Sequence, residues 1–465
     1  MAQLGEAVSR YHKLLEQEPY SDLAWAEEFQ ETMRRLQLAE SGRPVAPILR
    51  PHFISHRQLD TLGRITGQLA EILDRVESIA FASPHLLNRL QMLPAEKMLA
   101  AVPYGYSRFG VTSSMEAHIR NGSLCLSGFE ACRPAGLAYA DCLADIFLEL
   151  PLVKDFKRGR YKLSKLGAVK YMRRAIDDAW REFKRDGSKR DGCKVGAKSA
   201  ELRPAIAIVD LDQDANSPGD QSHLLAELLN QQGADARVVS LNHLEYAEGR
   251  LRVRDFAIDV VLRLLLTREL LTRFDLSHPL LRAYRDGAVC VVNSFRAEFA
   301  QRRSLFDLLT DETVTSHLPA DDRKLIRNFV PWTRIVSMRK TRHNEDEVDL
   351  PEFILRAQEN VILLPVEDRN DQLAYVGAEM TPTAWDRAVR LALRTPYVVQ
   401  ERKSAGSSLF PVFQYGDLRM KEAEVTIHPH LFNGRMRGAS AVLHTYASGL
   451  TTHLAVAPVL LLEEI

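Results

Sequence analysis

The sequence of 465 residues has little of what marks the specialised classes of protein. Its five cysteines are an odd number without a C-x-x-C pair, so we expect reduced thiols in a cytoplasmic protein. No run reaches the roughly 18 consecutive apolar residues of a membrane span, and the charged first residues lack the apolar core of a secretory signal. Lys plus Arg and Asp plus Glu both number 61, so no net charge favours nucleic acid or an anionic membrane as a partner.

What is present is the composition of an ordinary globular protein. Hydrophobic residues make up 46% of the chain and charged residues 26%, which allows a large buried core. The length alone suggests about three domains. The hydrophobic pattern then divides the chain into regions of different local structure.

Helical periodicity dominates the first 200 residues. Residues 5–39 predict two amphipathic helices separated by a short turn, and a third, long helix follows His56. Residues 123–129 alternate as a strand does, and a helix is expected at 137–150. Residues 184–204 are basic and glycine-rich without an aromatic side chain, which favours a solvated linker or mobile loop over a nucleic-acid contact.

An α/β pattern follows. Short apolar runs predict strands at 205–210, 236–241, 258–263 and 288–292, with helical segments between them. Strands alternating with helices at this spacing indicate a partly parallel sheet with crossover helices. From Pro396 onward, strands dominate the chain.

Six short segments carry a resemblance to a known family. They are residues 49–53, 134–141, 258–263, 291–296, 330–334 and 397–402. In their order and spacing the sequence resembles the circularly permuted ATP-grasp superfamily, whose members include glutathionylspermidine synthases. The resemblance covers the chain from about residue 45 to about residue 460.

The resemblance implies an α/β (α+β) fold in four parts. These are an N-terminal helical region at 1–100, a permuted ATP-grasp-like strand and helix segment at 101–204 that ends in the basic linker, an α/β domain like the pre-ATP-grasp domain at 205–300, and a strand-rich ATP-grasp-like lobe at 301–465. In this family ATP lies between two lobes, and magnesium bridges its phosphates to acidic and amide side chains. The nucleotide phosphorylates a carboxylate, and an amine then attacks the acyl phosphate.

The sequence departs from the family where magnesium is held. Gly128 and Glu130 stand at the positions of the family's Glu-x-Asn pair, and Gly110 stands where the family has an aspartate. Glycine offers no ligand. Glu130 and Asp417 remain as carboxylates that could rebuild a metal site from other positions.

The segment that covers the phosphates departs as well. Leu364 stands where the family has an ATP-contacting lysine, and the next loop has no glycine to let the backbone approach phosphates. Three carboxylates of this loop would repel a triphosphate without a metal: Glu367, Asp368 and Asp371. Further on, His444 stands where an asparagine is expected.

Other family-like residues remain. Gln400, Glu401 and Arg402 resemble the hinge that faces adenine, although strand packing would explain Gln400 and Glu401 equally well. Arg437 aligns with the arginine that faces the transferred phosphate and is the candidate catalytic residue.

Four arginines lie in segments that match the interlobe region of the family. They are candidates for binding a substrate or another anion, because guanidinium groups suit carboxylate and phosphate. Structural ion pairing is the alternative explanation. The four are Arg108, Arg263, Arg296 and Arg334.

Two local patterns are weaker. His428 and His430 could place two imidazoles on one face of a strand, but without a third ligand an exposed or hydrogen-bonded pair is expected rather than a metal site. Ser113 and Ser114 with His118 lack the G-x-S-x-G of a nucleophile elbow, which argues against a hydrolase.

The sequence therefore favours a catalytically degenerate ATP-grasp homologue that binds an anionic ligand, or a protein partner such as an active ligase or another biosynthetic enzyme. This hypothesis requires no cofactor, nucleic acid or membrane. The alternative is an ATP-dependent carboxylate–amine ligase with a rearranged active site, which would use ATP and magnesium. An enzyme of different chemistry in the same cleft is a third possibility.

Overall fold

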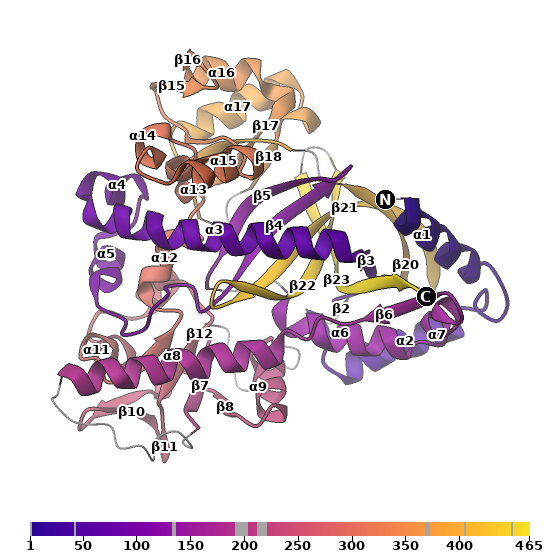
Figure 1. The fold of residues 1–465 in the computed structure, drawn as a ribbon, viewed down its shortest axis with the longest axis horizontal. Coiled ribbons are helices and arrows are strands. Elements are labelled where there is room, and N and C mark those ends of the chain that lie inside the picture. Colours follow the sequence, from indigo (N-terminus) through magenta and orange to yellow (C-terminus); the bar gives the residue numbers. More distant parts are fainter. Residues whose placement is uncertain are drawn as a thin grey trace.

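The computed structural model describes residues 2–40, 43–132, 136–190, 203–211, 221–367, 373–403, 406–447 and 450–465. A broad sheet lies at its centre, crossed by the long helix α3 (His56–Ala82), with a smaller sheet lobe on one side and a parallel α/β unit on the other (Figure 1). Within these ranges no helix is long and apolar enough to cross a lipid bilayer. The mixed helix and strand content confirms the predicted α/β class.

The N-terminal helices agree with the sequence. Helix α3 begins after Ser55 because the Ser55 hydroxyl accepts a hydrogen bond from the Gln58 N–H, and the Ser55 N–H donates to the Gln58 side chain. The elements of this part are α1 (Ala2–Leu15), α2 (Ala24–Arg35), β1 (Ala39–Glu40), β2 (Arg43–Pro44), β3 (His52–Ile54), α3 (His56–Ala82), α4 (Pro84–Arg89) and α5 (Pro94–Ala101).

The central sheet has eight strands. Six follow the order β3-β23-β22-β21-β4-β5, while β20 pairs with β21 and β6 pairs with β23. They confirm the strand predicted at 123–129 and the strand-rich C-terminal part. Their bounds are β4 (Thr112–Arg120), β5 (Ser123–Glu130), β6 (Tyr161–Ser164), β20 (Ser407–Gln414), β21 (Asp417–Phe432), β22 (Arg435–Ala447) and β23 (Leu450–Glu464).

A second sheet of four parallel strands, in the order β13-β12-β7-β8, confirms the predicted α/β region. Its strands are β7 (Ala205–Val209), β8 (Asp235–Val238), β12 (Val260–Arg263) and β13 (Cys290–Val292). Helices around it are α8 (Val169–Arg190), α9 (Gln221–Gln231), α10 (Thr267–Arg273) and α11 (Pro279–Arg285). The sequence did not predict the small antiparallel sheet of β9 (Glu245–Ala247), β10 (Arg250–Val253) and β11 (Phe256–Ala257), whose strands are too short to show periodicity.

The linker predicted at 184–204 is wrong for its first residues. Residues 184–190 continue helix α8, which is anchored to the core through buried side chains such as Met172 and Trp180. Composition suggested a loop because basic residues without large apolar neighbours occur both in loops and on the exposed face of a helix, where Lys184 and Arg185 lie. Residues 191–202 of the prediction lie outside the described residues.

The remaining lobe, called the small-sheet lobe, carries four strands in the order β14-β19-β17-β18. Helices α16 and α17 cover one side of this sheet with a core that includes Trp385 and Val399. The strands are β14 (Thr333–Ile335), β17 (Val361–Pro365), β18 (Tyr375–Val376) and β19 (Tyr397–Glu401), and the hairpin beside them is β15 (Lys340–His343) with β16 (Asp346–Asp349). The helices of this part are α12 (Glu298–Gln301), α13 (Ser304–Leu309), α14 (Glu312–Thr315), α15 (Ala320–Phe329), α16 (Leu350–Arg356) and α17 (Pro382–Ala392).

Two further helices, α6 (Leu137–Glu149) and α7 (Pro151–Lys157), lie near the chain termini (Figure 1).

The central sheet takes strands from three of the four predicted parts. Strand β3 comes from residues 1–100, β4 to β6 come from 101–204, and β20 to β23 come from 301–465. The four-part division of the chain therefore stays a prediction.

Candidate functional site

The two sides of the central sheet differ sharply in polarity. Residues such as Met115, Ala117 and Ile427 pack in the hydrophobic core that also contains the buried side of α3. Because side chains alternate along a strand, their neighbours point to the other side. That side, here called the polar face, carries Ser114, Glu116 and His118 of β4, Ser127 and Glu130 of β5, Thr426, His428 and His430 of β21, and Ser440 and His444 of β22.

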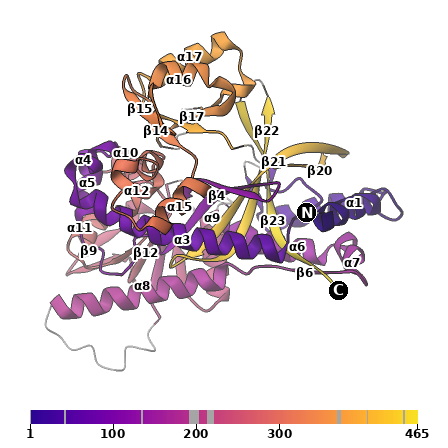
Figure 2. The same cartoon turned by 45° about the horizontal axis from the view of Figure 1, so that its top comes forward.

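The small-sheet lobe meets this polar face. The Gln400 side-chain amide on β19 donates hydrogen bonds to the Ser127 carbonyl oxygen (3.3 Å) and to Thr333 Oγ1 (3.0 Å). Arg402, directly after β19, forms an ion pair with Glu424 of β21 (2.9 Å). In the turned view of Figure 2 the lobe that carries α16 and α17 stands over the central sheet. The part of the polar face around Ser127 is therefore the floor of the contact between the two lobes.

Glu116 lies at the centre of the polar face. Its Oε2 accepts a hydrogen bond from Ser127 Oγ (3.2 Å), and Ser127 Oγ lies 2.7 Å from His118 Nε2. Arg303 Nη2 lies 3.7 Å from the other carboxylate oxygen. Burial alone would raise the pKa of Glu116, but the Arg303 guanidinium and the Ser127 hydroxyl lower it below the usual value. The side chain is therefore an ionised carboxylate at neutral pH.

This carboxylate occupies the space beside Gly128. A Cβ atom built on Gly128 would lie 2.4 Å from Glu116 Cδ and 2.5 and 2.8 Å from its two oxygens. Gly128 and Glu116 are direct partners in the β4–β5 ladder. The place of the first side-chain atom at position 128 is thus taken by a carboxylate from the neighbouring strand.

The histidines of the polar face are buried and neutral. Burial lowers the pKa of His118 and His428, lowers that of His430 to about 3, and lowers that of His444 to about 4. Neither ring nitrogen of His430 has a hydrogen-bond partner among the described residues. Of the expected exposed or hydrogen-bonded pair at His428 and His430, the exposed alternative is wrong, because the two residues are 5% and 0% exposed.

The described residues hold no ready-made cluster of metal ligands. Among them, no three His, Cys, Asp or Glu side chains are placed to hold a metal ion. Glu130, the predicted metal ligand, accepts a hydrogen bond from Ser114 Oγ (3.0 Å). Asp417 is exposed at the start of β21 and pairs with Arg419 (2.6 Å).

The predicted ATP contacts are engaged within the protein. Gln400 joins the two lobes as described above, and Arg402 pairs with Glu424. Glu401 contacts His343 Nε2 (2.8 Å) and Lys403 Nζ (3.1 Å). Leu364 pairs with Val398 in the same ladder that pairs Ile362 with Gln400, so Leu364 lies on the side of the small sheet that faces the central sheet. An apolar side chain stands where the family has its lysine.

The phosphate-covering loop is described only in part. Glu367 forms ion pairs with Arg268 (2.7 Å) and with Arg302. Asp368 and Asp371 lie outside the described residues.

The four predicted anion-binding arginines do not share one set of contacts. Arg108 pairs with Asp74 (2.6 Å), and Arg296 pairs with Glu77 (2.9 Å), both carboxylates of α3. The wholly buried Arg263 pairs with Glu298 (2.5 Å), and Arg334 lies in the small-sheet lobe among threonines. The predicted catalytic residue Arg437 is exposed, with its guanidinium 5.0 Å from the centre of the Tyr171 ring. Anion binding by these residues stays a prediction.

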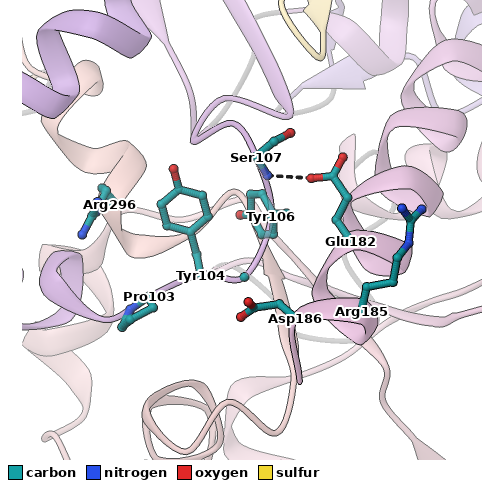
Figure 3. Close-up of a pocket in the computed structure, with 9 residues that line it drawn as sticks. Pro103, Tyr104, Tyr106, Ser107, Glu182, Arg185, Asp186 and Arg296 are labelled. Atoms are coloured by element: carbon teal, nitrogen blue, oxygen red, sulfur yellow. Dashed lines mark hydrogen bonds between the residues drawn. The ribbon is translucent and has the colours of Figure 1, made fainter. Parts of the chain in front are cut away.

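Arg296 also borders a hollow of about 610 Å³ (Figure 3). Tyr104 and Tyr106 form one wall, and Glu182 of α8, which accepts a hydrogen bond from the Ser107 N–H (2.6 Å), stands opposite. Two carboxylates and two arginines line this hollow. Their charges balance, so the hollow gives no preference for an anion.

Sequence reasoning missed Glu116, Ser127 and Arg303. For Glu116 the sequence did contain a signal, because polar Ser114, Glu116 and His118 alternate with apolar Met115 and Ala117 along residues 112–120, as in a strand with one polar side. Arg303 carries no such signal, since only the folded chain brings it to the sheet.

Comparison with known proteins agrees with this architecture. No family model matches the sequence, and no curated protein matches it. Among solved structures, a glutathione synthetase-like effector from Globodera pallida in its apo form matches with a TM-score of 0.56 and 10% identity, over 97% of this chain and 95% of that one. A putative gamma-glutamylcysteine synthetase from Methylobacillus flagellatus matches with a TM-score of 0.42 and 11% identity, over 88% and 89% of the two chains. The chain therefore has an α/β fold similar to that of the glutathione synthetase-like effector.

Proposed function

We propose that this chain is a circularly permuted ATP-grasp homologue that does not catalyse ATP-dependent ligation and acts by binding. Its partner is a small anionic ligand, or a protein such as an active ATP-grasp ligase or another biosynthetic enzyme. The proposal requires no cofactor and no contact with nucleic acid or membrane, and it expects a cytoplasmic protein.

The observation that carries the proposal is the position of Glu116 beside Gly128. The resemblance implies a magnesium ligand from position 128, and here that space holds a carboxylate already bound to Ser127. Leu364 adds a second defect, because it presents an apolar side chain to the interlobe contact where the phosphates would need a cation. The two changes together remove both metal and phosphate contacts.

The polar face supports a binding role. Buried polar groups in proteins are normally hydrogen-bonded, and a group without a partner is costly. His428 Nδ1, His444 Nδ1 and both nitrogens of His430 have no hydrogen-bond partner among the described residues. A bound polar ligand or a protein segment that reaches this face would supply such partners.

Glu116 also favours the alternative, a ligase with a rearranged active site. It is an ionised carboxylate on the interlobe side of the sheet, and carboxylate oxygens are the ligands that magnesium prefers. Under this alternative Glu116, rather than residue 128, would hold the metal and ATP would be required.

Calorimetric titration with ATP, with and without magnesium, separates the two functions. A site with a Kd near ~10 μM would stabilise the fold by roughly 2.7 kcal/mol at ~1 mM ligand, which a thermal melt would detect. We expect neither saturable magnesium-dependent binding nor ADP formation with mixtures of amines and carboxylates. If the natural chain binds ATP only with magnesium, and Glu116→Gln abolishes this binding, the proposal is overturned and the rearranged ligase is established.

A further inference from the structure

A large cavity lies at the edge of the small-sheet lobe, beside strand β14. Its volume is about 890 Å³, and α13 to α15, β14, β15 and the end of β19 line it. Arg334, in the wall of the cavity, lies opposite Val399 in the β14–β19 ladder, and the Val399 side chain belongs to the core under α16 and α17. The neighbouring pair, Thr333 and Gln400, faces the central sheet. Since successive residues of a strand point to opposite sides, Arg334 lies on the side of β14 away from Gln400 and Ser127.

The wall of the cavity is rich in unneutralised positive charge. Six cationic and three acidic side chains line it. Two of the acids are already paired: Asp311 with Arg89 (2.8 Å) and Glu401 with Lys403 (3.1 Å). Four arginines of the wall have no carboxylate within ion-pair distance in the described parts of the chain: Arg323, Arg327, Arg334 and Arg342. Against them stands one unpaired lining carboxylate, Glu312.

Arg334 is the unusual member of this set. Its side chain is only 6% exposed, yet all its hydrogen bonds go to neutral oxygens. The acceptors are Thr310 Oγ1 and O, Thr333 O, Thr341 Oγ1 and Arg342 O, at 2.7 to 3.4 Å. Buried charges in proteins are normally paired, because desolvation without a counterion is costly. Desolvation accordingly lowers the pKa of Arg334, and Asp307 and Asp311, which act from further away, offset only part of it.

We propose that this cavity is a binding site for a small, multiply charged anion of the phosphate type. The fixed charge of Arg334 lies in its wall, and the forks of Arg323, Arg327 and Arg342 supply donors from the more open side. Guanidinium forks match phosphate oxygens in pairs. Thr341 Oγ1 accepts a hydrogen bond from Arg334 and keeps its own proton to donate into the cavity.

The shape of the site selects a small molecule rather than an acidic protein segment. The charges surround a volume typical of small-ligand pockets instead of lying on an open surface. None of the residues that carry the function proposed above line this cavity, so the proposal does not depend on that function.

The test is calorimetric titration of the full chain with inorganic pyrophosphate, without magnesium and with sodium chloride adjusted to constant ionic strength. Two double variants each remove two positive charges from the same lobe. Arg327→Gln with Arg342→Gln removes two cavity arginines, whose side chains make no hydrogen bond or ion pair in the described residues. Arg356→Gln with Arg394→Gln removes two exposed arginines outside the cavity and is the matched control.

We expect saturable binding to the natural chain, a loss of at least ten-fold in affinity for the cavity variant, and a change of less than two-fold for the control. Citrate should bind more weakly than pyrophosphate. Absence of saturable binding at constant ionic strength would overturn the proposal. Equal losses in both double variants would do the same, because they would indicate attraction by the general charge of the lobe. Tighter binding of citrate would contradict the phosphate preference. Unchanged urea midpoints in both variants exclude unfolding as the cause of any loss.

Discussion

Replacing Gly128 with alanine tests directly whether Glu116 fills the space of a side chain at that position. The new Cβ would lie 2.4 Å from Glu116 Cδ, so the carboxylate has to move. It is the end of a flexible side chain, so the cost is not mainly steric. The cost is the loss of the Ser127 hydroxyl and of the nearby Arg303 as partners of a buried charge.

The expected magnitude follows from two opposing effects. A hydrogen bond to a charged group contributes about 1.5–3 kcal/mol. Replacing a glycine that does not need a left-handed backbone restricts the unfolded chain and stabilises by about 0.4–1 kcal/mol, and Gly128 has no positive φ. Gly128→Ala should therefore destabilise the natural chain by about 0.5–2.5 kcal/mol. In a Glu116→Ala background the first effect is absent, and the same change should stabilise by about 0.4–1 kcal/mol.

Urea denaturation of the four proteins of this double-mutant cycle measures both values. Gly110→Ala is the matched control, since its Cβ would lie 3.7 Å from Phe129 Cζ, an ordinary contact. It should be neutral or slightly stabilising in both backgrounds. If Gly128→Ala has the same effect with and without Glu116, the carboxylate does not fill that space, and the main support for the proposed loss of ligase activity is gone.

Two further predictions concern the buried charges and histidines. Arg263→Met should lower the free energy of unfolding, measured in urea, by about 3–5 kcal/mol, because it leaves the buried Glu298 without its counterion. The exposed Arg437→Gln is the control and should stay within about 0.5 kcal/mol of the natural chain. A similar loss in both variants would refute the idea that Arg263 and Glu298 form a buried ion pair. The folded-state pKa of His430 is about 3, below its usual value of 6.5, so the unfolded chain binds more protons between these values and stability falls as pH falls through this window. The free energy of unfolding should change by up to about 1.4 kcal/mol per pH unit because of this histidine. His430→Gln should reduce this pH dependence in urea titrations between about pH 4 and 6. An unchanged pH dependence would contradict a buried neutral imidazole.

The elements that periodicity marks clearly were predictable from sequence. Helix α3 shows apolar residues at three- and four-residue spacing together with a capping serine, and the parallel strands read as short apolar runs because both their sides are buried. The boundary at residue 184 was not predictable from composition, since a basic helical face and a basic loop have the same residues. Strands β9 to β11, of two to four residues each, are shorter than any period that a sequence can display.

The candidate site was predictable only in outline. The sequence shows that position 128 lacks a metal-ligand side chain. It does not show that the Glu116 carboxylate fills this space, because that depends on the strand register that sets Glu116 opposite Gly128. The small-sheet cavity was beyond reach for a similar reason. Arg334 was singled out with three other arginines, yet only the folded chain separates it from them and places it beside Arg323 and Arg327 of α15.

The residues that carried the family resemblance turn out to hold parts of the fold together. The Asn293 side chain bonds the backbone of Val111, Thr112 and Ala131, which ties the end of the parallel sheet to β4 and the end of β5. Gln400 joins the small sheet to the central one in the same manner. Each of these side chains bonds buried backbone groups of a neighbouring element, so it supports the fold whether or not a nucleotide ever binds. Motifs built on such residues therefore indicate the architecture, and the chemistry has to be inferred from the interlobe contact, where the Glu116 carboxylate fills the space beside Gly128 and Leu364 lies on the facing side of the small sheet.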